Sequence, residues 1–313
     1  MSKANTFTSK KINQDAVKKK QNIKSVLMDL KLLFKGLVLV LNVVPVFVGF
    51  WLAIYFTRTS FSTHWDVFLL TMLGSTAIVA GALALNNWYE VDLDREMRRT
   101  KQRPTVTGNF SLDMVKKIGI TLSVIGMLLL LFTTIEAAIY AFIGWFTYVV
   151  LYTFWSKRKY TMNTVIGSVS GAVTPFIGWA AIAPSFHVVP IILALLLFVW
   201  QIPHTFAIAI KRHDEYKAAG VPMLPVVMGF PITKRQMVVY IIALLPLPFF
   251  LSQLGTGFII IATLMTVGWI ILAIRGFFVD NDRKWAQHMF IYSLNYLTIL
   301  FILLVVFTLP LSH

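Results

Sequence analysis

The sequence contains no cysteine among its 313 residues, which excludes disulfide bonds and thiolate metal sites. Charged residues are also scarce, at 13% of the chain, whereas 58% of the residues are hydrophobic and the mean hydropathy is +0.75. Apolar stretches of about 20 residues, enough to cross roughly 30 Å of hydrocarbon, recur along the chain. The composition therefore predicts an all-α, polytopic membrane protein.

Nine apolar stretches are long enough to be transmembrane helices. They cover residues 36–56, 67–88, 118–135, 137–155, 164–182, 188–210, 237–254, 258–275 and 291–309. We expect one membrane domain, residues 31–313, in which nine helices surround a cavity that opens to the cytoplasmic side. Residues 1–30 form a lysine-rich cytoplasmic tail, which we expect to be disordered or bound to the membrane surface.

Acidic residues are few, 13 against 28 Lys and Arg, so the formal net charge is +15. This charge does not indicate a nucleic-acid partner, because the basic residues follow the loops. If the N-terminus is cytoplasmic, every Lys and Arg except Arg58 falls on the cytoplasmic side. The distribution predicts an integral protein of a bacterial plasma membrane, with the N-terminus in the cytoplasm and the C-terminus outside.

A polar stretch, NNWYEVDLDREMRRTKQRP at residues 86–104, follows the second predicted span. If the helix continues, Asn86, Glu90 and Asp94 have i, i+4, i+8 spacing and point from one face. Two carboxylates and an amide oxygen are hard ligands of the kind that Mg²⁺ takes. The alternative is a salt-bridged helix end in which Asp94 pairs with Arg98, and the stretch alone does not decide between the two.

Basic side chains close to these carboxylates would suit a diphosphate, because guanidinium and ammonium groups both bind phosphate oxygens. They come from the same stretch and from the loop after the fourth span. The candidates are Arg98, Lys101, Arg103, Lys157 and Arg158.

A second polar stretch ends the sixth predicted span, FVWQIPHTFAIAIKRHDEYKAAGVPMLPVV at residues 198–227. A histidine inside a span usually faces the bundle interior or a cavity, so His204 is a functional candidate. The alternative is a neutral imidazole that is bonded to a neighbouring helix. Lys211, Asp214 and Glu215 follow at the cytoplasmic end of the span.

The first stretch resembles the Asn-x-x-x-Asp-x-x-x-Asp motif of the intramembrane prenyltransferases of the UbiA superfamily, with Glu90 in place of the usual aspartate. The WQIPH…K…DEY…AAG-x-PMLP run and the segment YTFWSKRKYTMNTVIGSVSGAVTPFIGWAA, residues 152–181, look like the branch that modifies heme. The superfamily's second aspartate pair reads here as Lys211-x-x-x-Glu215, with Asp214 beside it.

The resemblance implies an Mg²⁺-dependent enzyme that transfers a farnesyl group from farnesyl diphosphate to a vinyl group of heme B. The product, heme O, serves terminal oxidases, so heme A synthase and oxidase-assembly proteins are expected partners besides the lipid bilayer. By the same resemblance, three residues hold the metal and three more complete the catalytic group, and His204 contacts heme. The metal ligands are Asn86, Glu90 and Asp94, and the other catalytic residues are Lys211, Asp214 and Glu215.

Two other functions fit part of the pattern. A prenyltransferase that acts on a quinone or another aromatic acceptor would share the first motif but not the WQIPH run. A transporter would show internal repeats and polar groups near the middle of the membrane. The charges lie almost wholly on one face, which opposes the transporter.

Overall fold

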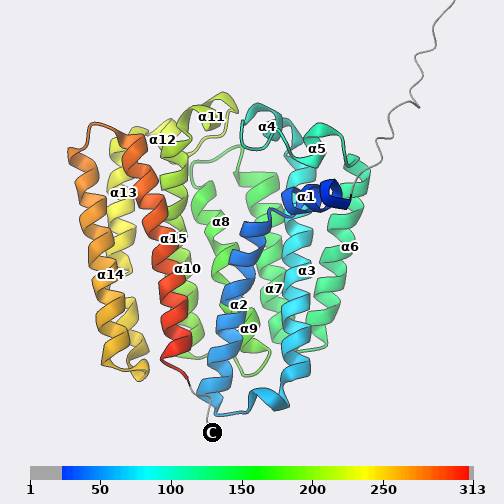
Figure 1. Ribbon diagram of the computed structural model, residues 1–313, viewed down its shortest axis with the longest axis vertical. Coiled ribbons are helices and arrows are strands. Elements are labelled where there is room, and N and C mark those ends of the chain that lie inside the picture. The colour runs from blue at the N-terminus through cyan, green and yellow to red at the C-terminus, as the bar shows by residue number, and fades with distance from the viewer. Residues whose placement is uncertain (1–22, 310–313) are drawn as a thin grey trace, which may run out of the picture.

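Long apolar helices stand side by side in one bundle, as Figure 1 shows for this computed structural model. The structure describes residues 23–309, and all of its regular elements in that range are helical. Most of the predicted N-terminal tail lies outside the described residues. Its last part, residues 23–30, belongs to helix α1.

The first half of the chain contains α1 (Ile23–Leu33), α2 (Gly36–Thr57), η1 (Phe61–Thr63), α3 (Trp65–Tyr89), α4 (Val91–Glu96), α5 (Pro104–Thr107), α6 (Leu112–Leu131), α7 (Ile135–Phe146) and the π-helix η2 (Thr147–Ser156). The second half contains α8 (Asn163–Ala172), α9 (Thr174–Ala180), α10 (Val188–Lys211), α11 (His213–Ala218), α12 (Leu224–Val227), α13 (Gly229–Ala243), η3 (Leu247–Leu254), α14 (Thr256–Arg275), η4 (Gly276–Phe278) and α15 (Asp282–Val306).

Eight helical segments of the described chain are long and apolar enough to cross a membrane, and they overlap eight of the nine predicted spans. The predicted span at residues 164–182 is instead divided into α8 and α9. Pro175 follows directly on the break and has no N–H to donate to the preceding turn. The break allows α9 to pack closely against α2, where a Cβ on Gly178 would meet the backbone of Val46.

Three predicted span starts are wrong because the helices begin in polar sequence. Helix α6 starts at Leu112 rather than 118, α13 starts at Gly229 rather than 237, and α15 starts at Asp282 rather than 291. The side chain of Ser111 caps α6 by accepting from Met114 N, and Asn281 caps α15 by accepting from Lys284 N. Hydropathy does not detect these turns, since they carry the charged residues of the loop.

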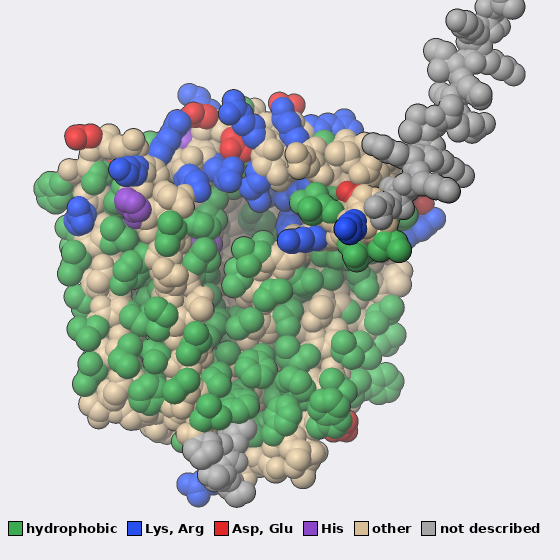
Figure 2. Space-filling model, in the orientation of Figure 1, with side chains coloured by type: hydrophobic (Ala, Val, Ile, Leu, Met, Phe, Trp, Pro, Cys, Tyr) green, Lys and Arg blue, Asp and Glu red, His purple; other side chains and the backbone are tan. Residues whose placement is uncertain are grey.

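Charged side chains gather at one end of the bundle. In Figure 1 the short helices α4, α5, α11 and α12 lie at the upper end, with α1 just below α5, and α15 ends at the lower end. Figure 2 shows Lys, Arg, Asp and Glu side chains crowded along the upper rim above a broad hydrophobic band. The one-sided charge distribution in the sequence therefore corresponds to one end of the bundle.

A glycine seam, defined by Gly74 and Gly81 of α3 with Gly119 and Gly126 of α6, brings two helix backbones into contact. A Cβ on Gly81 would lie 2.7 Å from Gly119 O, and a Cβ on Gly119 would lie 3.2 Å from Gly81 O. Small residues allow such close approach between helices in lipid, where packing rather than hydrophobic burial holds helices together. The seam fixes the last turns of α3, which carry the first polar stretch.

The two polar stretches are joined by an apolar cap cluster at the charged end. Its buried members come from α4, the end of α10 and the loop after α11, and they are Leu93, Met97, Ala209, Val221 and Met223. The cluster packs helix α4 against the segment that follows α10. The loops after α3 and α10 therefore lie together over the bundle.

The seam predicts that Gly81→Ala destabilises the protein by about 1–3 kcal/mol, because the added methyl group must push two backbones apart. Thermal unfolding of the purified protein in detergent would show a lower melting temperature. Gly257→Ala is the matched control, since its methyl group would meet only the end of the Phe307 ring, at 3.1 Å. Equal melting temperatures for the two variants would contradict the packing argument.

Candidate active site

The first part of the polar stretch, residues 86–96, forms a nearly continuous helix at the end of α3. Glu90 N donates to Asn86 O at 3.0 Å, and Asp94 N donates to Glu90 O at 2.9 Å, so the i→i+4 ladder runs across the break between α3 and α4. The three side chains are 1%, 2% and 3% exposed, whereas Asp92 lies at the surface. The predicted face therefore exists and points into the protein.

Each of these three side chains accepts a hydrogen bond from a cation. The pairs are Lys35 with Asn86, Lys157 with Glu90, and Arg103 with Asp94. Both carboxylate contacts are 2.5 Å long. The cations come from the α1–α2 junction, the loop after η2 and the residue before α5. We call these six residues the charge cluster.

The pairing of the salt-bridged alternative is wrong, because Asp94 pairs with Arg103 rather than with Arg98. The carboxylate of Asp94 is drawn into the protein by a residue nine positions later in the chain. Thr100 supports this turn, since its hydroxyl donates to Asp94 O at 2.9 Å. The stretch is thus a folded-over loop with a buried ion pair, and not a solvated helix end.

The electrostatics of the charge cluster favour the ionised forms of Glu90 and Lys157. Burial alone would raise the pKa of Glu90, but the ammonium groups of Lys157 and Lys35 and the hydrogen bond from Lys157 outweigh it and lower that pKa. Burial acts to lower the pKa of Lys157, but the Glu90 carboxylate more than compensates and raises it. Lys35 differs, since burial and the Arg103 charge hold its pKa well below the usual 10.5.

The donor atoms of the charge cluster fit a divalent cation. Glu90 Oε1 is buried and has no hydrogen-bond partner in the structure. Such an orphaned oxygen is unfavourable unless a cation or water satisfies it. Within residues 23–309 no group of three or more His, Asp or Glu side chains is gathered as a metal site. The available set is two carboxylates and one amide oxygen, which suits a hard ion that keeps several waters, such as Mg²⁺.

The π-helix η2 supplies the wall of the site that faces Asn86 and Glu90. Its wider turn, marked by the Lys157 N bond to Tyr152 O at 2.9 Å, continues directly into Lys157. Asn86 Nδ2 donates to Thr153 Oγ1 at 3.0 Å, and Lys157 Nζ lies 5.4 Å from the centre of the Tyr152 ring. Such π-helical turns are rare and occur frequently at functional sites.

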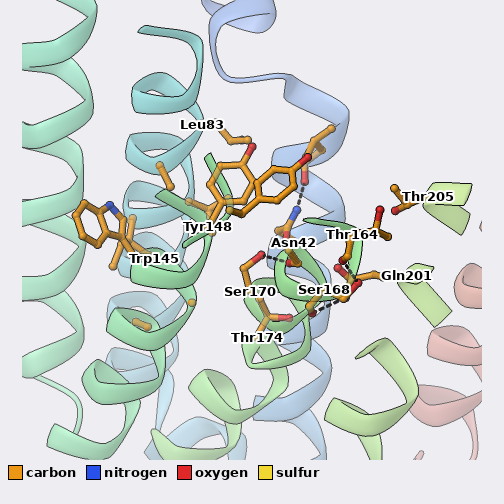
Figure 3. A pocket seen from close by; sticks show the side chains of 18 residues that line it. Asn42, Leu83, Trp145, Tyr148, Thr164, Ser168, Ser170, Thr174, Gln201 and Thr205 are labelled. Carbon is orange, nitrogen blue, oxygen red and sulfur yellow. Dashed lines mark hydrogen bonds between the residues drawn. The ribbon is translucent and has the colours of Figure 1, made fainter. Parts of the chain in front are cut away.

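A cavity of about 230 Å³ lies inside the bundle, and Figure 3 shows the side chains that line it. It adjoins the charge cluster through Tyr152, whose ring lies next to Lys157. Ala82 and Leu83 of its wall are one turn before Asn86, and Tyr152 of its wall precedes Thr153. Apolar and aromatic side chains line most of the cavity, together with seven polar ones: Asn42, Thr164, Ser168, Ser170, Thr174, Gln201 and Thr205. Side chains labelled in Figure 3 include Asn42, Leu83, Trp145, Tyr148, Thr164, Ser168, Gln201 and Thr205.

The sequence analysis missed several residues of this region. Tyr148, Tyr152 and Thr153 were not predicted as site residues, although Tyr152 and Thr153 open the quoted segment 152–181, because a polar residue within an apolar span does not by itself indicate a role. Lys35 was counted only as a topology signal. Its position at the boundary of the first span was the one available hint.

The second polar stretch lies in a different hollow, at the surface of the charged end. There Arg98 joins Lys211 and Glu215, so the structure brings residues of both stretches together. Asp214 accepts from Arg283 at 2.7 Å, and Glu215 accepts from Arg212 at 2.9 Å. This hollow has a volume of about 370 Å³, and we call it the surface hollow.

Some of the other predicted anion contacts lie at the surface, and some belong to the charge cluster. Arg158 makes two 2.7 Å contacts to the exposed carboxylate of Asp92 and lies over the Tyr89 ring. Lys101 is exposed. Of the five predicted anion contacts, only Arg103 and Lys157 therefore belong to the charge cluster.

His204 faces α15. Its Nδ1 atom lies 2.7 Å from Ser293 Oγ, and its ring stacks on Trp200 at 4.6 Å between centroids. The hydrogen bond to a neighbouring helix, which the sequence analysis gave as the alternative for His204, is therefore present. The same bond occupies one ring nitrogen and orients the ring, which leaves Nε2 as the atom for any ligand. Lys211 and His204 both contact Phe290, at 5.5 and 5.2 Å from its ring centre.

The lowered pKa of Glu90 predicts how stability depends on pH. A carboxylate whose folded pKa is depressed contributes stability above its unfolded pKa, near 4.5, and loses that contribution as the pH falls through the folded value. The melting-temperature difference between the wild type and Glu90→Gln should be largest at neutral pH and shrink below about pH 4.5. Glu96→Gln, which changes an exposed carboxylate, is the control. A difference that does not vary with pH would contradict the electrostatic assignment.

Similar proteins agree with this architecture. The model of the UbiA prenyltransferase family matches residues 42–294. A protoheme IX farnesyltransferase of Oceanobacillus iheyensis is 52% identical over 311 residues, 99% of each chain, and protoheme IX farnesyltransferase 2 of Bacillus subtilis is 52% identical over 86% of this chain and 88% of its own.

Two solved structures share the fold at low sequence identity. A digeranylgeranylglyceryl phosphate synthase has a TM-score of 0.71 at 19% identity, and covers 90% of this chain and 98% of its own. A UbiA homologue from Archaeoglobus fulgidus, bound to DMAPP and Mg²⁺, has a TM-score of 0.68 at 15% identity, and covers 88% and 99%. The matched family region and the identity to full-length relatives lead to one conclusion: this chain belongs to the UbiA prenyltransferase family.

Proposed function

We propose that this protein transfers the farnesyl group of farnesyl diphosphate to a vinyl group of heme B and so forms heme O. The observation that carries the proposal is a buried charge cluster directly beside a largely apolar cavity, in a chain 52% identical to a protoheme IX farnesyltransferase over nearly its full length. An anionic head and a fifteen-carbon chain need these two environments side by side. The same features disfavour a transporter.

The bundle suits nine membrane crossings with the active site at the cytoplasmic end. The segment η2 and helix α10 both end at the charged end, so the chain between them must return through the bundle, and α8 and α9 supply that ninth crossing. The positive-inside rule then puts the charged end and the N-terminus in the cytoplasm and the C-terminus outside. The cavity would open toward the cytoplasmic face through the charge cluster.

Asn86, Glu90 and Asp94 are the residues that would hold Mg²⁺ in this proposal. When bound, the ion supplies positive charge to the departing diphosphate. Lys157 and Arg103 are bound to the same carboxylates. In this proposal their remaining N–H groups donate to the diphosphate oxygens. Stabilising charge as it develops on the leaving group is the main contribution a protein makes to such a reaction.

The reaction breaks the bond between carbon 1 of the farnesyl group and the diphosphate oxygen, which leaves with the electron pair. The allylic cation accepts the π electrons of the heme vinyl group, which forms a carbon–carbon bond and leaves a new cation next to the ring. Water adds to that cation and loses a proton to give the hydroxyethylfarnesyl side chain. An apolar cavity excludes other water molecules that would capture the first cation.

His204 is our candidate for the heme contact, either as an iron ligand or as a group that orients the macrocycle. Ser293 fixes its ring, and the rings of Trp200 and Phe290 provide flat apolar surfaces next to it. Lys211, Asp214 and Glu215 line the surface hollow with Arg98, and we propose that this hollow guides the anionic substrate to the site. Heme A synthase or oxidase-assembly proteins would take up the product.

Glu90→Gln and Asp94→Asn should each lower turnover by at least about a hundredfold, the effect of removing one group that stabilises transition-state charge. Asp92→Asn is the matched control, because it removes an exposed carboxylate two residues away and should leave most of the activity. The assay incubates the purified protein with heme B, farnesyl diphosphate and Mg²⁺. Chromatography and mass spectrometry then measure the farnesylated, hydrated heme.

Two arms of this assay test the proposal itself. Replacing heme B with a quinone precursor should give no prenylated product, and omission of Mg²⁺ should abolish heme O formation. A wild type that prenylates the quinone precursor but not heme B would favour the other acceptor class. Near-normal turnover of both Glu90→Gln and Asp94→Asn would remove the metal assignment.

His204→Ala should weaken heme B binding about tenfold or more, as expected for loss of one ligand or one strong hydrogen bond. The binding is measured by titration of heme B into the purified protein and followed by its absorption spectrum. Ser293→Ala is a second variant, which removes only the partner that orients the ring. Unchanged heme affinity and activity in His204→Ala would end the heme-contact assignment.

A further inference from the structure

Lys35 has an unusual backbone for a lysine. It lies at the junction of α1 and α2 with φ 48° and ψ 52°, in the left-handed region. Within the described residues the only other non-glycine residue with positive φ is Arg58. Residues with a Cβ rarely adopt this conformation, which persists where the surroundings or a function hold it. A glycine could adopt this conformation without a steric penalty, so its occurrence at a lysine needs an explanation.

Contacts with α3 fix the α1–α2 junction and thereby the direction of the Lys35 side chain. Leu33 is fully buried in a cluster with Ala84 and Val115, and Asn87 Nδ2 donates to Leu33 O at 2.5 Å. Helix α1 is therefore fixed to α3, the helix that carries Asn86. From this anchor the Lys35 side chain extends inward, where its ammonium group donates to Asn86 Oδ1.

That contact competes with a metal on the same oxygen. Asn86 Oδ1 is the oxygen that the proposed function assigns to Mg²⁺, and an ammonium group and a divalent cation repel each other at one ligand atom. Binding of the metal therefore favours the release of Lys35 from Asn86. Since its backbone is anchored, its ammonium group can reach only groups close to the charge cluster.

The sum of the charges in the loaded site indicates that the new partner of Lys35 is the diphosphate. Mg²⁺ bound to the trianion of a diphosphate ester carries one net negative charge, and Glu90 and Asp94 add two more. Lys157 and Arg103 neutralise two of these three charges, which leaves one negative charge in a buried site. Buried charge without a counter-ion is strongly unfavourable. A third cation in the cluster would neutralise this charge, and Lys35 is the remaining basic residue of the charge cluster.

We propose that Lys35 is a diphosphate-binding residue that holds the Asn86 carboxamide in the ligand-free protein and transfers to a diphosphate oxygen when metal and substrate bind. The inference rests on the proposed function for the identity of the anion. It assigns Lys35 two partners in succession, and therefore makes opposite predictions for the binding of metal alone and of the anion.

The test compares binding to the purified full-length chain in detergent by calorimetry, with Mn²⁺ alone and with inorganic diphosphate in the presence of Mg²⁺. Lys35→Met keeps the length of the side chain and removes its charge. It should bind Mn²⁺ at least as tightly as the wild type, because the competing ammonium group is gone. It should bind diphosphate about tenfold or more weakly, the effect of one charge-assisted hydrogen bond.

Two further variants complete the comparison. Lys35→Arg keeps the charge and should retain diphosphate affinity within about threefold, well under the effect of a lost charged hydrogen bond. Lys31→Met removes an exposed lysine one turn earlier in α1 and should change neither affinity.

Three outcomes would overturn the inference. Unchanged diphosphate affinity in Lys35→Met would show that the lysine does not contact the anion. Weaker Mn²⁺ and weaker diphosphate binding together would show that it only supports Asn86. Loss of diphosphate binding in Lys35→Arg equal to that in Lys35→Met would show that its charge is irrelevant. None of these readouts needs heme, so a failure of the proposed farnesyl transfer remains distinguishable.

Discussion

The structure depends on how two buried carboxylates, Glu90 and Asp94, are neutralised at the end of an apolar bundle. An unpaired buried charge is too unfavourable to persist, so each carboxylate requires a cation within hydrogen-bonding distance. The two cations come from the loop after η2 and from the residue before α5, and a third, Lys35, comes from the α1–α2 junction. This requirement makes three distant segments converge on the last turn of α3.

Close packing holds the backbone around the charge cluster in fixed positions. The glycine seam holds α3 against α6, and the apolar cap cluster holds α4 against the segment after α10. The π-helix η2 carries Thr153 to Asn86 and continues into Lys157. A site on packed helices keeps its groups in place without ligand, as pre-organised electrostatic stabilisation requires.

The charge cluster is polar, whereas the cavity beside it is mainly apolar. A prenyl diphosphate has an anionic head and a hydrocarbon chain, and the structure offers adjoining environments for both. Placing the charges at one end of the bundle also avoids charged side chains in the middle of the membrane. This arrangement agrees with the family that the sequence comparisons show.

The sequence alone determined the membrane class, eight of the spans, the one-sided charge distribution and the buried face of Asn86, Glu90 and Asp94, because hydropathy and i+4 spacing are local properties. Tertiary structure decided the rest. Asp94 pairs with Arg103 rather than Arg98, Lys35 enters the site from the first span, and Lys211 lies in a separate hollow. The predicted span at residues 164–182 breaks into two helices, of which α9 packs against α2 and α7, and α8 packs against α10 and η2. These outcomes depend on which segments meet in space, and the chain's local pattern does not encode that.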